Sequence, residues 1–165
     1  MHTGNDTEAG VLMEKYMKRA LELAREAFSE GEVPVGAVVV KKTTGEIVGE
    51  GRNRRETAKN ALAHAEIEAI DQACRTLGGW RLPECALYVT LEPCPMCCGA
   101  IINSRIDNVY FGAYDYKSGS AESVQKMFSL PYNYRPEVIG GMMEEECSAI
   151  LSEFFKELRL RKKKK

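Results

Sequence analysis

Apolar residues recur every three or four positions in three long segments of the chain, and this spacing predicts amphipathic helices. The first segment runs from Glu8 to Glu30 and stops at Gly31, a helix-ending residue. The second begins at about Ala63 and ends at Gly78-Gly79. The third lies near the C-terminus, and its apolar face consists of Cys147, Ile150, Leu151, Phe154, Phe155 and Leu158.

Short segments rich in valine, isoleucine and glycine alternate with these helices and predict strands. Residues 35–41 and 46–53 flank Thr43-Thr44-Gly45 as a hairpin, and further strands are expected at 86–90, 109–112 and 137–140. A short helix over 95–104 has proline in its first turn. Residues 54–60 are expected to form a loop, and 113–136 an irregular segment with a short helix near 124–128. This order predicts an α/β fold with a mixed sheet covered by helices on both faces.

The length and composition narrow the class of protein further. A chain of 165 residues fits a single domain over 1–165, with an ordered core over about 8–160. No apolar run approaches the roughly 18 residues that span a bilayer, and residues 1–10 lack the features of an export signal. We therefore expect a cytoplasmic protein whose six cysteines are reduced.

Charge is unevenly distributed along the chain. The net charge is −1, but the C-terminal end carries six basic residues, so residues 1–158 hold 17 basic and 24 acidic groups, a balance of −7. Residues 161–165 form a basic C-terminal tail in this interpretation. Such a cluster either binds nucleic acid by releasing counterions or is simply a solvated tail.

Two fragments carry the candidate chemistry, and each stands at the start of a predicted helix. They are His64-Ala65-Glu66 and Pro93-Cys94-Pro95-Met96-Cys97. Cysteines three apart at a helix start can both face one ion, and the free amides there favour the thiolate. Together with His64 they offer three ligands suited to tetrahedral zinc, with the fourth position open for catalysis. Histidine, x, glutamate followed by proline-cysteine-x-x-cysteine is the known pattern of zinc deaminases that act on nucleobases.

Other interpretations of these residues stay open. A structural zinc site would need a fourth protein ligand, and the adjacent thiol of Cys98 points about 100° around the helix from Cys97. Glu66 is either an ordinary carboxylate at a helix start or, two residues from a ligand, the group that moves protons during deamination. The remaining cysteines are expected to pack as small apolar groups: Cys74, Cys85, Cys98 and Cys147.

The chain resembles the cytidine deaminase superfamily and, within it, the bacterial tRNA-specific adenosine deaminases. The likeness covers nearly the whole sequence, and its most specific stretches are 31–37, 63–67, 87–100, 104–106, 111–113 and 154–159. It implies a three-layer α/β/α sandwich with a five-stranded mixed sheet, one zinc ion per subunit, and a homodimer. It also implies hydrolysis of adenosine to inosine at the wobble position of a tRNA anticodon stem-loop, arginine tRNA being the expected substrate.

The resemblance further implies which residues contact the substrate. Asn53 falls where the family contacts the target nucleoside, Asp115 and Lys117 match its Asp-x-Lys loop, and Phe155 and Arg159 match residues that grip the anticodon loop. Each also has a structural alternative: a strand-end amide for Asn53, a turn for residues 115–117, core packing for Phe155 and a solvated face for Arg159.

Two rival functions share parts of this evidence. A deaminase of a free base or nucleoside, such as guanine or cytosine, would use the same zinc machinery, but it would give the basic C-terminal helix no phosphate to contact. A non-catalytic RNA-binding or zinc-stabilised module would need a closed metal site or would lack Glu66.

Overall fold

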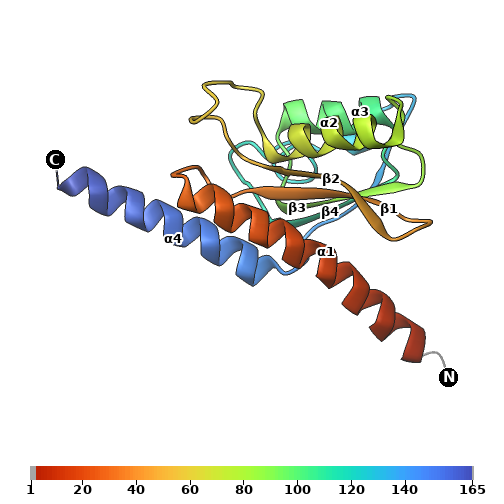
Figure 1. The fold of residues 1–165 in the computed structure, drawn as a ribbon, viewed down its shortest axis with the longest axis horizontal. Helices are drawn as coiled ribbons and strands as arrows, with labels where there is room; N and C mark the ends of the chain where they lie inside the picture. The colour runs from red at the N-terminus through yellow and green to blue at the C-terminus, as the bar shows by residue number, and fades with distance from the viewer. Residues whose placement is uncertain (1–2, 165) are drawn as a thin grey trace.

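The computed structural model describes residues 3–164, with the side chains of residues 3–9 and 12 outside the description. Its helices and strands follow in the order α1 (Thr3–Ser29), β1 (Gly36–Lys41), β2 (Glu46–Arg52), α2 (Ala65–Leu77), β3 (Cys85–Leu91), α3 (Pro95–Ser104), β4 (Asn108–Ala113), the 3₁₀ turn η1 (Met127–Ser129), β5 (Glu137–Ile139) and α4 (Glu144–Lys163) (Figure 1).

The five strands form one mixed sheet in the order β2-β1-β3-β4-β5. Strand β1 runs antiparallel to both β2 and β3, whereas β4 is parallel to β3 and β5. Parallel neighbours need a crossover, and α3 supplies it between β3 and β4. The predicted hairpin and mixed sheet are therefore confirmed.

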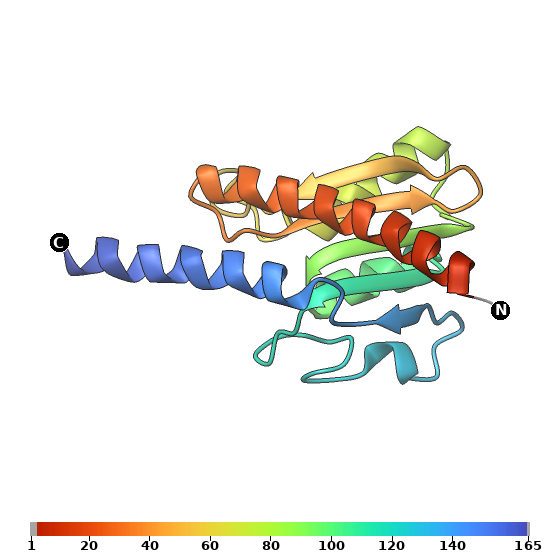
Figure 2. The ribbon, with the colours of Figure 1, turned by 90° about the horizontal axis from the view of Figure 1, so that it is seen from below.

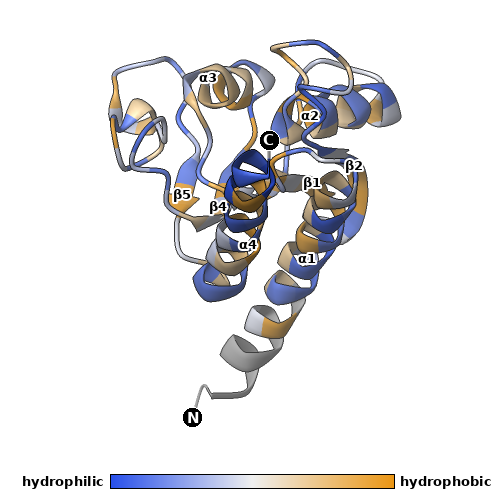
Figure 3. Ribbon diagram, turned by 90° about the vertical axis from the view of Figure 1, so that its left-hand side faces the viewer, coloured by the Kyte–Doolittle hydropathy of each residue, from blue (hydrophilic) through white to orange (hydrophobic). Residues whose placement is uncertain are grey.

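Helices cover both faces of the sheet, with α2 and α3 on one side and α1 and α4 on the other (Figure 3). Strand residues alternate between the two layers: Ala37 and Val39 of β1 pack toward α2 and α3, whereas Val38 and Val40 pack toward α1 and α4. This period of two places a hydrophobic core on each face. The three-layer α/β/α sandwich expected from the sequence is confirmed.

Three glycines let the helices lie directly against the sheet. A Cβ at Gly36 would stand 1.9 Å from the carbonyl oxygen of Ala20 in α1. On the opposite face, a Cβ at Gly49 or Gly51 would stand 2.1 Å from a backbone oxygen of α2. Since no carbon fits at these distances, glycine alone permits this contact, which fixes the height of α2 above β2.

The C-terminal helix differs from its prediction in two respects. Residues 161–163 continue α4, so the basic segment predicted as a tail is largely helical. Only Cys147, Ile150 and Phe154 of the predicted apolar face are buried, whereas Phe155 is 42% exposed and Leu158 36% exposed. Figure 2 shows that the C-terminal part of α4 runs beyond the sheet, so the sheet does not cover it. Phe155 and Leu158 instead line open grooves.

The helix expected near 124–128 is a single 3₁₀ turn at Met127–Ser129. All six cysteines are free; Cys85, Cys98 and Cys147 are buried and Cys74 is half-buried, as expected of small apolar groups. Over residues 3–164, no helix is both long and apolar enough to cross a membrane.

Candidate active site

Two helix starts meet at one edge of the sheet and bring the predicted ligands together. His64 is the N-cap residue of α2, Cys94 is the N-cap residue of α3, and both have extended backbone. Pro95, in the first turn of α3, fixes the entry of the chain into that helix. Neither side chain caps its own helix, so both side chains are available to a ligand.

The three predicted ligand atoms form a compact group. The Sγ atoms of Cys94 and Cys97 lie 3.7 Å and 3.6 Å from Nδ1 of His64. Tetrahedral zinc with ordinary bond lengths separates a sulfur and a nitrogen ligand by about 3.6 Å, so the spacing fits that ion. Among the side chains that the structure describes, no other group of three His, Cys, Asp or Glu residues could hold a metal. The thiol of Cys98 instead faces the carbonyl oxygen of Pro93, 3.6 Å away.

The electrostatics of this group favour a thiolate at Cys94 and a proton-transfer role for Glu66. Hydrogen bonds from the Cys97 thiol and from His64 lower the pKa of Cys94 to about 4. Burial raises the pKa of Glu66 to about 7, and its side chain is 4% exposed. A carboxyl group with a pKa near neutrality can both accept and release a proton, which is the property required of a general acid–base group.

A pocket of about 490 Å³ opens above these residues, within the size range of small-molecule sites. The pocket is lined by residues predicted for catalysis and by residues predicted for substrate binding. The first group is His64, Glu66 and Cys94, which we call the chemical end of the pocket, and the second is Asn53, Asp115, Lys117 and Phe155. Arg159 lies outside this pocket, in an adjoining groove lined also by Lys117, Phe155 and Lys162.

Two polar wall residues are already engaged in the protein. The amide of Asn53 donates from Nδ2 to the carbonyl oxygen of Val33 at 3.1 Å and accepts from the backbone N–H of Arg55 at 3.3 Å. The carboxylate of Asp115 accepts from the backbone N–H groups of Lys117 and Ser118 at 3.0 Å and 3.2 Å. These bonds orient both side chains before any substrate is present.

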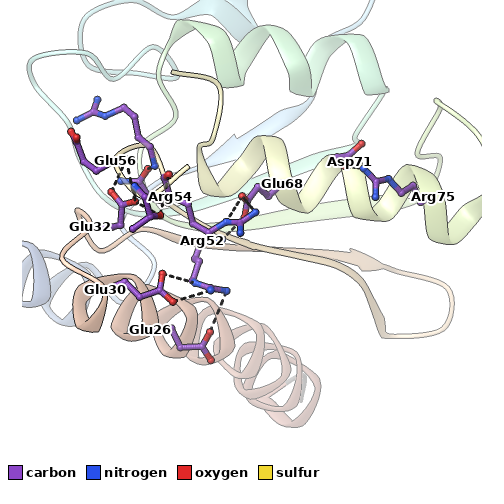
Figure 4. Close-up of polar contacts among 12 residues, drawn as sticks. Glu26, Glu30, Glu32, Arg52, Arg54, Glu56, Glu68, Asp71 and Arg75 are labelled. Carbon is purple, nitrogen blue, oxygen red and sulfur yellow. Dashed lines mark hydrogen bonds and ion pairs between the residues drawn. The ribbon is translucent and has the colours of Figure 1, made fainter. Parts of the chain in front are cut away.

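One wall, the loop over 53–63, is tied to the rest of the protein by a buried carboxylate. Glu32, 1% exposed, accepts from the backbone N–H groups of Glu56 and Thr57 at 2.9–3.1 Å and from the Thr57 hydroxyl at 2.8 Å. Arg54 at the start of the loop forms an ion pair of 2.6 Å with Glu68 of α2. Figure 4 shows these contacts beside the ion pairs of Arg52 with α1.

The opposite wall, the loop over 114–123, has an equivalent buried carboxylate. Glu92, 2% exposed, accepts from the backbone N–H groups of Asp115 at 3.1 Å and of Glu122 and Ser123 at 2.9 Å. The Ser123 hydroxyl donates to it as well. Burial alone would raise the pKa of Glu92, but the hydrogen bonds outweigh it, and the pKa lies below its usual value. Glu92 is therefore ionised at neutral pH and holds this loop together.

Comparison with known proteins identifies the family. The model of the MafB19-like deaminases matches residues 12–159. A tRNA-specific adenosine deaminase from Bacillus subtilis (strain 168) is 49% identical over 91% of this chain and 92% of its own length. The chain belongs to the tRNA-specific adenosine deaminase family. The resemblance predicted from the sequence motifs is thereby confirmed.

Solved structures place this deaminase among two kinds of relative. A structure from studies of A-to-I editing by tRNA:A34 deaminases at the wobble position is 44% identical, with a TM-score of 0.80 over 84% of this chain and 99% of that chain. A guanine deaminase from Bacillus subtilis is 37% identical, with a TM-score of 0.58 over 76% of this chain and 82% of that chain. The fold is common to both, and the first is the more similar by identity and by structure.

Sequence reasoning missed both carboxylates that hold the loop walls of this deaminase. Glu92 had a partial signal, because it is a charged residue directly after the predicted strand over 86–90 and Leu91. Glu32 lies in the family-specific stretch 31–37, but its local pattern gave no sign of this role, since it follows Gly31 in what looks like an ordinary polar turn. Neither sequence position reveals the backbone amides that the carboxylate binds.

Proposed function

We propose that this protein hydrolyses adenosine to inosine at the wobble position of a tRNA anticodon and releases ammonia. The observation that carries the proposal is a single pocket with a zinc-type ligand group and a buried Glu66 at one end, and with Lys117 and Phe155 at the other. Lys117 and Phe155 also line the groove of Arg159 and Lys162, so the reacting centre is continuous with a basic, partly aromatic surface. Relatives at 41–49% identity carry the name of this activity.

In this proposal His64, Cys94 and Cys97 hold one zinc ion per chain. When bound, zinc supplies a Lewis acid that makes water nucleophilic near neutral pH. Glu66 takes a proton from the attacking water, delivers one to a ring nitrogen so that the carbon bearing the amine becomes electrophilic, and protonates the amine as it departs. The overall balance is adenosine plus water giving inosine plus ammonia.

The wall residues bind and orient the RNA. Asn53, held by its contacts to Val33 and Arg55, presents its remaining amide hydrogen to the target nucleoside. Lys117 and Arg159 pair with phosphates, and the half-exposed ring of Phe155 packs against the anticodon loop. Binding energy from these remote contacts orients the flipped base over the chemical end of the pocket.

Three finer expectations belong to this proposal. The substrate is an arginine tRNA with adenosine at the wobble position, the enzyme acts as a homodimer, and it works in the cytoplasm. They rest on the family resemblance, and the exposed apolar side chains of Leu62, Leu77 and Trp80 are candidates for a subunit contact.

The decisive experiment compares substrates under identical conditions. Purified protein is incubated with an anticodon stem-loop carrying a wobble adenosine and, separately, with free guanine and free adenosine. We expect inosine in the stem-loop, read by sequencing, and little ammonia from the free compounds. Turnover of guanine with the RNA unmodified would contradict the proposal and would favour the alternative of a free-base deaminase.

A further inference from the structure

Tyr116 is an aromatic residue at the mouth of the pocket that the chemistry above does not use. Its side chain is 80% exposed, the largest exposure among the large apolar residues that the structure describes. It nevertheless lines the pocket, between Asp115 and Lys117. A ring so exposed does not contribute to the core, which directs attention to what it could bind.

The position of this ring is set by aromatic packing behind it. The ring of Tyr116 lies nearly parallel to that of Tyr114, with an interplanar angle of 15° and centroids 6.3 Å apart. Tyr114 in turn meets the fully buried ring of Phe111 edge to face at 5.0 Å. Tyr116 is therefore the outermost member of an aromatic series that begins in the core.

The backbone that carries Tyr116 is also restrained. Glu92 binds the N–H group of the preceding residue, Asp115, and the Asp115 carboxylate binds the N–H group of the following residue, Lys117. A side chain mounted on such a turn loses little backbone entropy when it binds, which is the physical advantage of preorganisation.

We propose that Tyr116 is a stacking platform for a nucleotide base next to the deaminated adenosine. The inference rests on the proposed function. If one base enters the pocket, its neighbours in the strand must leave across the rim, where Tyr116 offers a ring and Lys117 offers a positive charge. A ring beside a cation is the combination by which proteins bind single-stranded nucleic acid without reading the sequence. A free base has no neighbour to stack, so this contact serves only a polymeric substrate.

The test pairs Tyr116→Ala with Tyr116→Phe, which keeps the ring and removes the hydroxyl. Stacking acts on bound substrate and transition state alike, so Tyr116→Ala should raise KM for the stem-loop roughly 5- to 150-fold with little change in kcat. Tyr116→Phe should stay near the parent. Zinc content and melting temperature, measured on both variants, should match the parent, because the ring lies outside the core.

RNA variants identify the base. Stem-loops with an abasic nucleotide on the 5′ or the 3′ side of the target are compared with intact RNA. With the parent protein, one of the two abasic stem-loops should raise KM by the same factor as Tyr116→Ala does with intact RNA. For Tyr116→Ala, KM should be the same with that abasic stem-loop as with intact RNA.

Three results would overturn the inference. An unchanged KM for Tyr116→Ala rejects any contact, and an equal loss in Tyr116→Phe replaces stacking by a bond to the hydroxyl. If Tyr116→Ala and each abasic RNA raise KM, and the two effects add in free energy when combined, then Tyr116 does not stack on either neighbouring base. Failure of the parent protein to modify any stem-loop is a different outcome, because it removes the proposed function and this inference with it.

Discussion

The floor and the rim of the pocket are built in contrasting ways. The floor holds His64, Glu66, Cys94 and Cys97, which come from two short fragments at helix starts; Glu66 and Cys97 are buried, and His64 and Cys94 are half-buried. The rim draws on residues far apart in the chain, from the loops over 53–63 and 114–123 and from the end of α4. The proposed chemistry depends on residues close together within two short fragments of the chain, whereas the proposed recognition depends on residues from distant segments.

This difference explains where specificity has to reside. A floor that removes an exocyclic amine can serve several bases, and a guanine deaminase shares the fold. Selection of RNA over a free base then depends on the rim, which a fold comparison describes least well. Variants of the floor should abolish turnover for every substrate, and variants of the rim should affect RNA alone.

The largest effect is expected from Cys94→Ala. Loss of one of three protein ligands should remove the zinc and bring deamination to background, as measured by metal analysis and inosine formation. Cys98→Ala is the matched control, because Cys98 is buried on the same helix and its thiol points to Pro93. Full zinc and full activity in Cys94→Ala would refute the ligand assignment.

Next in size is Glu66→Gln. The amide keeps the shape of the side chain but cannot carry the proton, so the rate should fall by roughly 10²- to 10⁴-fold, with zinc content and RNA affinity preserved. Asp71→Asn, an exposed carboxylate on the same helix, is the control and should leave the rate unchanged. Turnover of Glu66→Gln within about threefold of the parent would reject the role in proton transfer.

Rim variants should have smaller effects that depend on salt. Arg159→Ala should weaken stem-loop binding, and each lost phosphate contact should make the slope of log affinity against log salt shallower by roughly 0.7. Deletion of residues 161–165 removes five positive charges and should act in the same direction while the zinc remains. Arg75→Ala, on an exposed side chain of α2, is the control for net charge. Equal salt slopes in all variants would show that these groups do not contact phosphate.

The smallest effect on turnover is expected from variants of the two buried carboxylates, Glu92 and Glu32. Hydrogen exchange should show that each carboxylate stabilises only its own loop. Glu92→Gln should speed hydrogen exchange of the amides of Asp115, Glu122 and Ser123, roughly 5- to 150-fold per lost bond. Glu32→Gln should do the same for Glu56 and Thr57 only. Exchange that rises across the whole protein in either variant would indicate general destabilisation instead.

The Glu92 contribution should also depend on pH in a definite direction. Its folded-state pKa lies below the ordinary 4.5, so its stabilisation is present above pH 4.5 and is lost as the pH falls through the lower folded value. The difference in melting temperature between the parent and Glu92→Gln should therefore be constant near neutrality and shrink in acid.

The sequence predicted the layers of the fold because their cause is periodic. Period-two strands and an amphipathic first helix reveal which face is buried, and all five strands occur where expected. The end of α4 was predicted less well: Phe155 and Leu158 continue the apolar spacing, but they are partly exposed and line open grooves instead of the core. The spacing of apolar residues shows which face of a helix is buried, but it does not show how far along the helix the covering sheet extends.

The candidate site was likewise only partly predictable from the sequence. The grouping of His64, Cys94 and Cys97 was predictable because these three candidate ligands lie within a few residues of two recognisable helix starts. The position of Glu92 directly after a strand was a partial signal, but its role was not predictable, since its amide donors are 23–31 residues away in a segment without periodicity. Contacts between a side chain and a distant backbone leave no trace in local spacing.

The close approach at Gly36, Gly49 and Gly51 has a consequence for genetics. In a saturation library selected for editing, these positions should be as intolerant as the three proposed ligands, although none of them lines the pocket. The two classes of loss would separate by protein level: ligand variants would accumulate as inactive protein, and glycine variants, whose helices are forced off the sheet, would be degraded.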